Sequence, residues 1–212
     1  MPAVAVCGFP RSGSTMMMTM LHAGGIPPAN GASTAGYEFT HLDGHAQLTA
    51  TRVDQRAVKL LDTPLHTPNI LEALPDTAWS FIWMDRNPID QTLSQLKFLE
   101  ATGHLDHLPT DEPKRRNAYL NMGERIHQSL THDRPRILGL LRRTGPTLVI
   151  PYERALAQPA KTARLVARHL PWADLNRPAA AAAAHHRTGV CRDALSVDLA
   201  PTEQTDARHP RL

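Results

Sequence analysis

Residues 8–15 combine an arginine, three hydroxyl side chains and two glycines in a pattern that favours the binding of an anion. They read Gly-Phe-Pro-Arg-Ser-Gly-Ser-Thr, and they lie between an apolar run at residues 3–7 and a helix-compatible stretch at residues 16–22. A strand followed by a glycine-containing loop and a helix start directs successive backbone N–H groups at one point. Arg11 adds a planar guanidinium suited to phosphate or sulfate oxygens. We therefore expect this segment to hold a phosphate or sulfate group.

The spacing of the two glycines is that of a nucleotide-binding P-loop, which reads Gly-x-x-x-x-Gly-Lys-Ser/Thr. Gly8 and Gly13 fit this pattern, but Ser14 stands in the position of the lysine. Asp85, at the end of a later apolar run, is compatible with the metal-holding aspartate of a P-loop kinase or nucleotide hydrolase. Such an enzyme is one hypothesis, although it leaves the missing lysine unexplained.

Four apolar runs of strand length alternate with stretches that favour helices; they are residues 3–7, 57–61, 79–84 and 147–150. This alternation predicts an α/β fold of three layers, a parallel sheet flanked by helices as in P-loop proteins. Ligands of such sheets bind beyond the carboxyl ends of the strands. We therefore expect the chemistry-bearing residues that follow the four runs to share one rim. They are Gly8, Asp62, Asp85, Arg86, Tyr152 and Glu153.

The sequence also contains signals for where helices start and end. Asn87 and Pro88 predict a helix start, because asparagine caps helices and proline fits the first helical position. The longest helical region runs from about residue 114 to residue 143, and we expect a break at Arg134 and Pro135, since proline removes a helical hydrogen bond. A further helix is predicted at residues 161–170.

Length and composition predict one soluble, cytoplasmic domain over residues 1–200, followed by a mobile tail at 201–212. The 212 residues are 42% hydrophobic and 20% charged, which are globular values. A net charge of +3 with 5% aromatic residues gives no support to nucleic acid as a partner. No run approaches the length of a membrane span. Cys7 is expected to be a buried thiol, and no Cys/His cluster favours a metal site.

Two segments resemble the sulfotransferases that use 3′-phosphoadenosine 5′-phosphosulfate (PAPS) as sulfate donor. Arg86-Asn87-Pro88, with Ser94 eight residues after the arginine, resembles the family's 3′-phosphate motif, which implies that Arg86 and Ser94 hold the 3′-phosphate. The N-terminal loop resembles the family's 5′-phosphosulfate loop. Its matching residues are Pro10, Arg11, Ser12, Gly13, Ser14 and Thr15.

Two further segments resemble the same family less closely. Tyr152-Glu153 follows the fourth predicted strand and has a family counterpart. Arg187-Thr188-Gly189 resembles a basic Arg-Lys-Gly segment that touches the 3′ side of the nucleotide. Threonine replaces the middle lysine, so the resemblance carries over only Arg187 and Gly189.

The family also implies a general base that takes the proton of the acceptor. Cytosolic members carry Lys-Thr-His-x-Pro after the second strand, whereas residues 62–66 of this chain read Asp-Thr-Pro-Leu-His. Other branches use a glutamate after the first helix, and Glu38 in Gly-Tyr-Glu-Phe resembles that pattern. We prefer Glu38 over His66 as the base, with Asp62 and His41 as alternatives.

The resemblance implies an enzyme that moves the sulfuryl group of PAPS to a hydroxyl or amine acceptor and releases adenosine 3′,5′-bisphosphate (PAP). Arg11 would stabilise charge on the departing 5′-phosphate. No metal is expected, because a sulfuryl group carries less negative charge than a phosphoryl group. The sequence leaves open a small-molecule, carbohydrate or peptide acceptor and the oligomeric state. A non-catalytic relative that binds PAPS or PAP is a further hypothesis, favoured by the altered segment at residues 62–66.

Overall fold

The part of the chain that the structure describes contains one parallel sheet of four strands. This computed structural model describes residues 2–29, 53–61, 74 and 77–184. The strand order is β2-β1-β3-β4. The strands are β1 (Ala3–Gly8), β2 (Ala57–Leu61), β3 (Trp79–Asp85) and β4 (Thr147–Pro151). The predicted parallel α/β architecture is confirmed.

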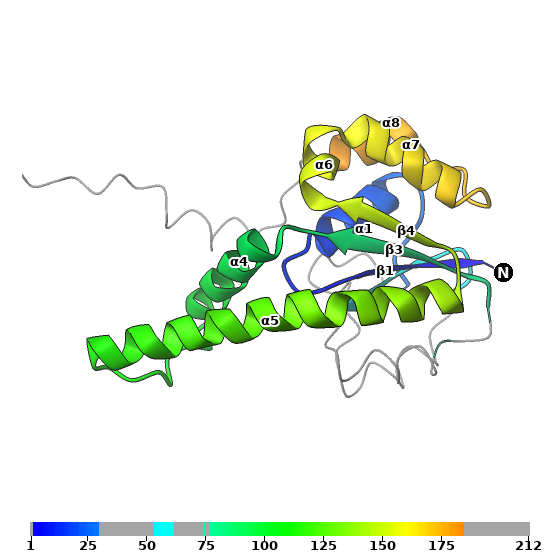
Figure 1. Ribbon diagram of the computed structural model, residues 1–212. Coiled ribbons are helices and arrows are strands. Elements are labelled where there is room, and N and C mark those ends of the chain that lie inside the picture. Colours follow the sequence, from blue (N-terminus) through cyan, green and yellow to red (C-terminus); the bar gives the residue numbers. More distant parts are fainter. Residues whose placement is uncertain (1, 30–52, 62–73, 75–76, 185–212) are drawn as a thin grey trace, which may run out of the picture.

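Helices cover both faces of the sheet (Figure 1). On one face lie α1 (Ser14–Ala23), α6 (Tyr152–Ala157), α7 (Pro159–His169) and α8 (Arg177–Ala183). On the other face lies α5 (Glu112–Thr144), which extends well past the sheet and packs there against α4 (Pro88–Ala101). The strands run toward the end of the sheet at which α4 begins, so the carboxyl ends of β1 and β3 meet the starts of α1 and α4.

The sheet has a hydrophobic core on each face, which explains why its strands are continuous apolar runs rather than alternating ones. Side chains of alternate residues point to opposite faces. The core toward α1, α7 and α8 includes Val4, Val6, Ile82 and Met84. The core toward α5 includes Ala5, Cys7, Phe81 and Trp83.

The predicted break in the long helix is wrong, because α5 is continuous from Glu112 to Thr144 with Pro135 inside it. Proline in a helix interior costs about 3 kcal/mol or more. The turns after Pro135 bury Ile137, Leu138 and Leu141 against the sheet, and this packing offsets that cost. The helix α6, of six residues, directly follows β4 and was not predicted from the sequence.

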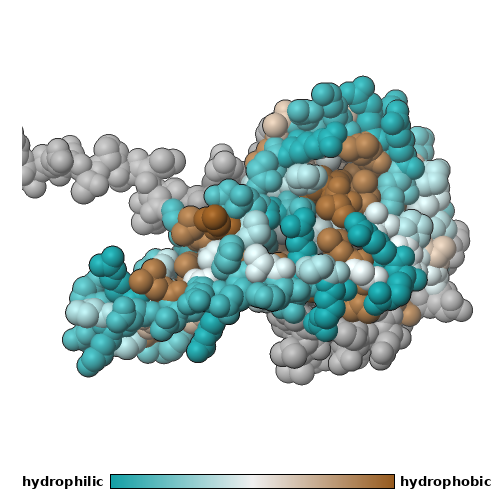
Figure 2. Space-filling view, in the orientation of Figure 1, coloured by the Kyte–Doolittle hydropathy of each residue, from teal (hydrophilic) through white to brown (hydrophobic). Residues whose placement is uncertain are grey.

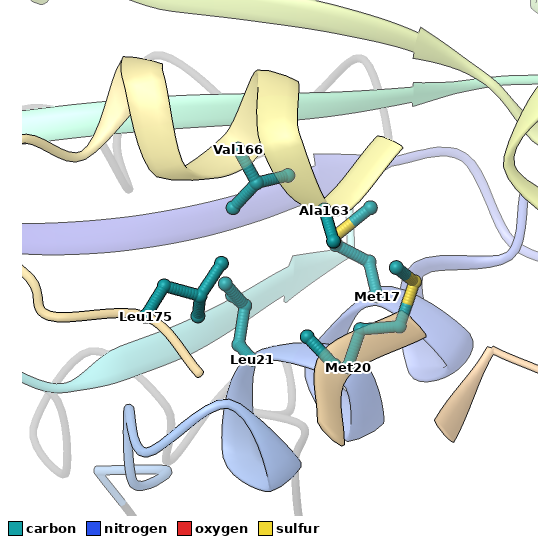
Figure 3. Close-up of a pocket in the computed structure, with 7 residues that line it drawn as sticks. Met17, Met20, Leu21, Ala163, Val166 and Leu175 are labelled. Atoms are coloured by element: carbon teal, nitrogen blue, oxygen red, sulfur yellow. The ribbon is translucent and has the colours of Figure 1, made fainter. Parts of the chain in front are cut away.

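A small pocket lies where α1 packs against α7 and α8 (Figure 3). Its lining is entirely apolar, and it has no room for a water molecule. It is lined by Met17, Met20, Leu21, Ala163, Val166, Leu175 and Ala180. The pocket is therefore a packing gap in the core and offers no group that could do chemistry.

The surface differs between the layers. Figure 2 shows mostly polar side chains along α5 and apolar ones between α5 and the helices on the other face of the sheet, where the edge strand β4 lies. Ile89 and Leu93 are exposed near the start of α4. Among the helices that the structure describes, none combines the length and the apolar composition that a membrane crossing requires.

Candidate functional site

The loop between β1 and α1 has a backbone conformation that demands glycine at its end. Gly13 precedes α1 with φ 95° and ψ 13°, in the left-handed region. A Cβ atom at this position would lie 2.3 Å from Cδ2 of Tyr152. Both the backbone and the neighbouring ring therefore exclude a side chain. Arg11 also has a positive φ, of 66°, which is uncommon for a residue with a side chain and is held by its surroundings.

Two side chains from the β3–α4 region hold this loop. Gln91 Nε2 donates a hydrogen bond to Pro10 O at 2.8 Å, and Arg86 Nη1 donates one to Arg11 O at 2.9 Å. Gln91 is a buried polar residue on α4 that sequence analysis did not single out. The carboxyl ends of β1 and β3 thus share a rim, as predicted.

Arg11 reaches from the loop along α4. Its Nε donates to Ser94 Oγ at 3.4 Å, and its Cζ lies 5.1 Å from the centre of the Phe98 ring. The Cζ of Arg86 lies 4.8 Å from the centre of the Tyr152 ring. Such cation–π contacts orient guanidinium groups. The loop arginine and the predicted 3′-phosphate residues Arg86 and Ser94 therefore form one cluster.

A second cation reaches the loop from the neighbouring strand. Lys59 on β2 pairs in register with Val6 on β1 and is 3% exposed. Its Nζ donates to Thr15 Oγ1, in the first turn of α1, at 2.8 Å. The sequence predicts a strand at residues 57–61 but indicates no role for Lys59 within it. The signal was the lysine itself in an apolar strand, because a lysine side chain is almost never fully buried unless its charge is paired.

Some polar groups at the rim lack partners among the residues that the structure describes. Ser12 Oγ and Arg86 Nε are buried and make no hydrogen bond there, and α1 has no side-chain cap. A buried donor without a partner costs about 1–3 kcal/mol, so such groups mark places where a ligand or water completes the bonding. These donors fit the oxygens of a phosphate or sulfate group.

Comparison with known proteins places this geometry in a known fold. No protein-family model and no curated protein matches the sequence. The crystal structure of sulfotransferase STF9 from Mycobacterium avium matches with a TM-score of 0.54 at 15% identity, over 93% of this chain and 68% of that chain. Mouse sulfotransferase SULT7A1, complexed with PAP, matches with a TM-score of 0.52 at 16% identity, over 88% of this chain. The chain has the sulfotransferase fold.

The match to the mouse protein covers 64% of that protein's length, so the chain spans less than two thirds of it. The likeness confirms the fold that the resemblance of the loop implied.

At the rim of this sulfotransferase fold, Asp85 is engaged by a cation. It is the last residue of β3 and forms an ion pair with Arg134 of α5. Burial raises the pKa of Asp85 above its ordinary value of 3.8, although the Arg134 charge opposes this shift. Nearby, Glu153 Oε1 accepts a hydrogen bond from Asn87 N at 3.4 Å. Arg134 thus supplies a counter-charge for Asp85.

Several predicted site residues lie outside the described residues. These are Glu38, His41, Asp62, His66, Arg187 and Gly189, together with the predicted tail at 201–212. The described residues therefore include most of the predicted nucleotide site but none of the candidate bases, and the choice of the base stays a prediction. Of the two segments with the weaker resemblance, only Tyr152-Glu153 is described, and it lies at the rim.

Proposed function

We propose that this protein binds PAPS and transfers its sulfuryl group to a hydroxyl or amine acceptor. The observation that carries the proposal is the contact between the two predicted phosphate-binding segments. Arg11 Nε lies 3.4 Å from Ser94 Oγ, and Arg86 Nη1 lies 2.9 Å from Arg11 O. A nucleotide phosphorylated at both the 3′ and the 5′ position needs two neighbouring anion sites, and the contacts among Arg11, Arg86 and Ser94 support such a pair at this rim. The sulfotransferase fold supports the same assignment.

The first anion site is the start of α1. Its first-turn N–H groups, which have no side-chain cap, and the hydroxyls of Ser14 and Thr15 would bind the 5′-phosphate and stabilise the charge that develops on it. Arg86 and Ser94 would hold the 3′-phosphate, and the unpartnered Nε of Arg86 is a donor suited to it. Arg11 lies between the two sites, because its backbone belongs to the loop and its side chain contacts Ser94.

Bound PAPS would supply a sulfuryl group on a phosphate leaving group. In the transfer, a bond forms between the acceptor oxygen or nitrogen and sulfur while the bond from sulfur to the 5′-phosphate oxygen breaks. The acceptor proton passes to a base, and PAP leaves with the electron pair of the broken bond. The residues of this chain act mainly by positioning the groups and by stabilising charge, as in phosphoryl transfer.

We propose Glu38 as that base, on the sequence pattern Gly-Tyr-Glu-Phe. Glu38→Gln should keep the affinity for PAP and lower turnover about 100-fold or more, the range expected for loss of a general base. Turnover would be measured with PAPS and a panel of phenol, amine, sugar and peptide acceptors. Near-normal turnover in Glu38→Gln would instead assign the base to His66 or Asp62.

The direct test of the donor is a titration with PAP and with Mg-ATP. We expect PAP to bind more tightly, and a preference for Mg-ATP would refute the assignment in favour of a P-loop kinase or hydrolase. That rival requires a metal-holding aspartate, whereas Asp85 is paired with Arg134. If PAP binds but no acceptor is sulfated, the non-catalytic hypothesis gains.

The role of Arg86 has a sharper test. Arg86→Ala should weaken PAP binding about tenfold or more, because a charge-assisted hydrogen bond contributes about 1.5–3 kcal/mol. Binding of adenosine 5′-phosphosulfate, which lacks the 3′-phosphate, should change much less. Arg116→Ala, an exposed arginine on α5, is the matched control. Equal losses for both nucleotides would show that Arg86 acts only by holding the loop.

A further inference from the structure

The loop between β1 and α1 contains a β-turn that has its arginine at a strained position. Ser12 N donates a hydrogen bond to Phe9 O at 3.1 Å, which closes a turn with Pro10 and Arg11 at its two central positions. The proline ring requires a negative φ, whereas Arg11 has a φ of 66°. A negative φ followed by a positive one is the pattern of a type II turn. The residue with positive φ in such a turn is usually glycine or asparagine, and here it is an arginine.

Local preference alone would favour a type I turn for the same four residues. Proline fits the first central position of either type, and an arginine after it would take a negative φ in type I. The two types differ in the central peptide, here between Pro10 and Arg11, which is rotated by about half a turn from one type to the other. The left-handed region is unfavourable for a residue with a Cβ atom. Contacts from outside the turn must therefore hold this peptide in its type II orientation.

Gln91 on α4 makes such a contact. Its Nε2 donates a hydrogen bond at 2.8 Å to Pro10 O, which is the carbonyl oxygen of that central peptide. Because a peptide is planar and trans, a bond that fixes the carbonyl also fixes the direction of the Arg11 N–H. Rotation to the type I orientation would turn Pro10 O away from Gln91. The Gln91 side chain is 3% exposed, so the loss of this partner would be unfavourable.

The next peptide of the turn is held from the same part of the fold. Arg86 Nη1 donates a hydrogen bond to Arg11 O at 2.9 Å, so donors from the β3–α4 region bind the carbonyls before and after Arg11. The Arg11 side chain contacts Ser94 and Phe98 on α4. Gln91 is the uncharged member of this set, and its contact is with the backbone of the turn. Its chemistry is therefore that of a group that orients the loop.

We propose that Gln91 is a positioning residue, which holds the Pro10–Arg11 peptide in the type II orientation and thereby keeps Arg11 at the anion site. Gln91 acts through the backbone of the turn, without contact with the nucleotide. The proposal rests on the proposed function for the identity of that nucleotide. The orientation of the turn does not depend on it, and the effect on binding requires only that a phosphate or sulfate group binds at the loop.

The first experiment reads the turn by NMR in the ligand-free protein. In a type II turn the Arg11 N–H lies close to the Pro10 Hα, whereas in a type I turn it points away from it. The nuclear Overhauser effect between these two protons should be strong in wild type. It should be weak in Gln91→Met, which keeps the length of the side chain but has no donor. The control is Gln128→Met, at an exposed glutamine on α5, and it should match wild type. A strong effect in Gln91→Met would overturn the proposal.

Titration with inorganic pyrophosphate and with PAP measures the consequence for the anion site. Gln91→Met should bind each probe about tenfold more weakly, because only the fraction of molecules that retains the type II turn is competent to bind. Gln128→Met should bind both probes as wild type does. Wild-type affinity for both probes in Gln91→Met would refute a role of Gln91 in the anion site.

A cycle of variants with Arg11→Gly separates this role from a merely structural one. Glycine adopts a positive φ readily, so a turn with Arg11→Gly needs no external contact to stay in type II. Arg11→Gly alone should weaken pyrophosphate binding, because the guanidinium is lost. Adding Gln91→Met should weaken it by less than about twofold further, and the strong Overhauser effect should return. A further tenfold loss would show that Gln91 supports the site in another way, and the proposal would be wrong.

Gln91→Glu provides a second variant if Gln91→Met does not fold. It keeps the size of the side chain and replaces the amide donor with a carboxylate oxygen, so at neutral pH it should also lose the strong Overhauser effect and bind pyrophosphate more weakly. A type II turn together with wild-type affinity in Gln91→Glu would contradict the proposal as directly as the same result in Gln91→Met.

The two probes distinguish failure of this proposal from failure of the proposed function. If the wild-type protein binds pyrophosphate but not PAP, the proposed nucleotide is wrong, and the pyrophosphate affinity of Gln91→Met still decides the role of Gln91. If PAP binds and the Gln91 variants keep both the type II turn and the wild-type affinity, the proposed function stands and the role of Gln91 is refuted.

Discussion

Two helices begin at the same rim of the sheet, and their first turns are built in opposite ways. α4 begins after β3 with Asn87, whose side chain accepts hydrogen bonds from Ile89 N and Asp90 N. α1 begins after β1 with Gly13, which has no side chain to cap it. The first turn of α4 includes the acidic Asp90, whereas that of α1 contains no acidic residue.

This difference indicates which helix start can receive an anion. The partial positive charge of the α4 start is already met by Asn87 and Asp90, so a phosphate there would compete with them. The first-turn N–H groups of α1 have no side-chain cap, and Lys59 adds a cation beside them. We therefore propose the α1 start as the anion site, with α4 contributing through the side chain of Ser94 rather than through its first turn.

The largest predicted effect is that of Gly13→Ala. The new Cβ would lie 2.3 Å from the Tyr152 ring, and φ is 95°. Strain in the left-handed region and overpacking together should lower the free energy of unfolding by about 2–4 kcal/mol. PAP affinity should fall at least tenfold, because the first turn of α1 must shift. Urea unfolding and calorimetric titration measure the two effects.

Tyr152→Ala and the double variant Gly13→Ala/Tyr152→Ala separate the steric clash with the ring from the backbone strain at residue 13. Without the ring, Gly13→Ala should cost less, with about 1–2 kcal/mol remaining from the positive φ. An equal cost in both backgrounds would show that the Tyr152 ring is not what excludes a side chain at residue 13. In that case only the backbone, and not the packing, would distinguish the α1 start from that of α4.

The α1 loop and the two strands at its sides could be predicted from the sequence, because local rules govern them. Each signal lies within a short stretch of sequence: the glycine spacing, the apolar runs and the helix start at Asn87-Pro88. Lys59 and Gln91 could not be assigned in this way. Their contacts with Thr15 and Pro10 join residues 44 and 81 positions apart, and only the sheet order brings them together.

The wrong prediction in α5 has a similar cause. Pro135 is a local signal for a break, but packing on the sheet holds the helix through it. The short helix α6 was not predicted, because six residues are too few to show the apolar periodicity of a helix. In both places tertiary contacts outweigh local preference.

A smaller effect should follow from removing the cap of α4. Asn87→Ala should lower the free energy of unfolding by about 1 kcal/mol, the usual value for an N-cap, and change PAP affinity by less than about twofold. Asn176→Ala removes the corresponding cap of α8, where Asn176 accepts from Ala179 N, and is the matched control. If Asn87→Ala weakened PAP binding as much as Gly13→Ala, both helix starts would belong to the anion site, and the contrast between them would fail.

The smallest effect concerns Asp85, which lies just before the α4 start. Because burial raises its pKa in the folded protein above 3.8, the folded state takes up a proton here at a higher pH than the unfolded chain. The free energy of unfolding of wild type, relative to Asp85→Asn, should therefore increase as pH falls through the raised pKa and level off below 3.8. Urea unfolding at a series of pH values measures this difference.

Arg134→Gln provides the converse test of the same site. Arg134 lowers the pKa of Asp85 against the effect of burial, so its removal should raise that pKa further and move the change in stability to higher pH. The affinity for PAP at neutral pH should stay near the wild-type value, because the Asp85–Arg134 pair lies between β3 and α5 rather than at the α1 start. A pH profile that does not move in Arg134→Gln would mean that the ion pair does not set the charge of Asp85. The negative charge near the α4 start would then come from Asp90 and Glu153.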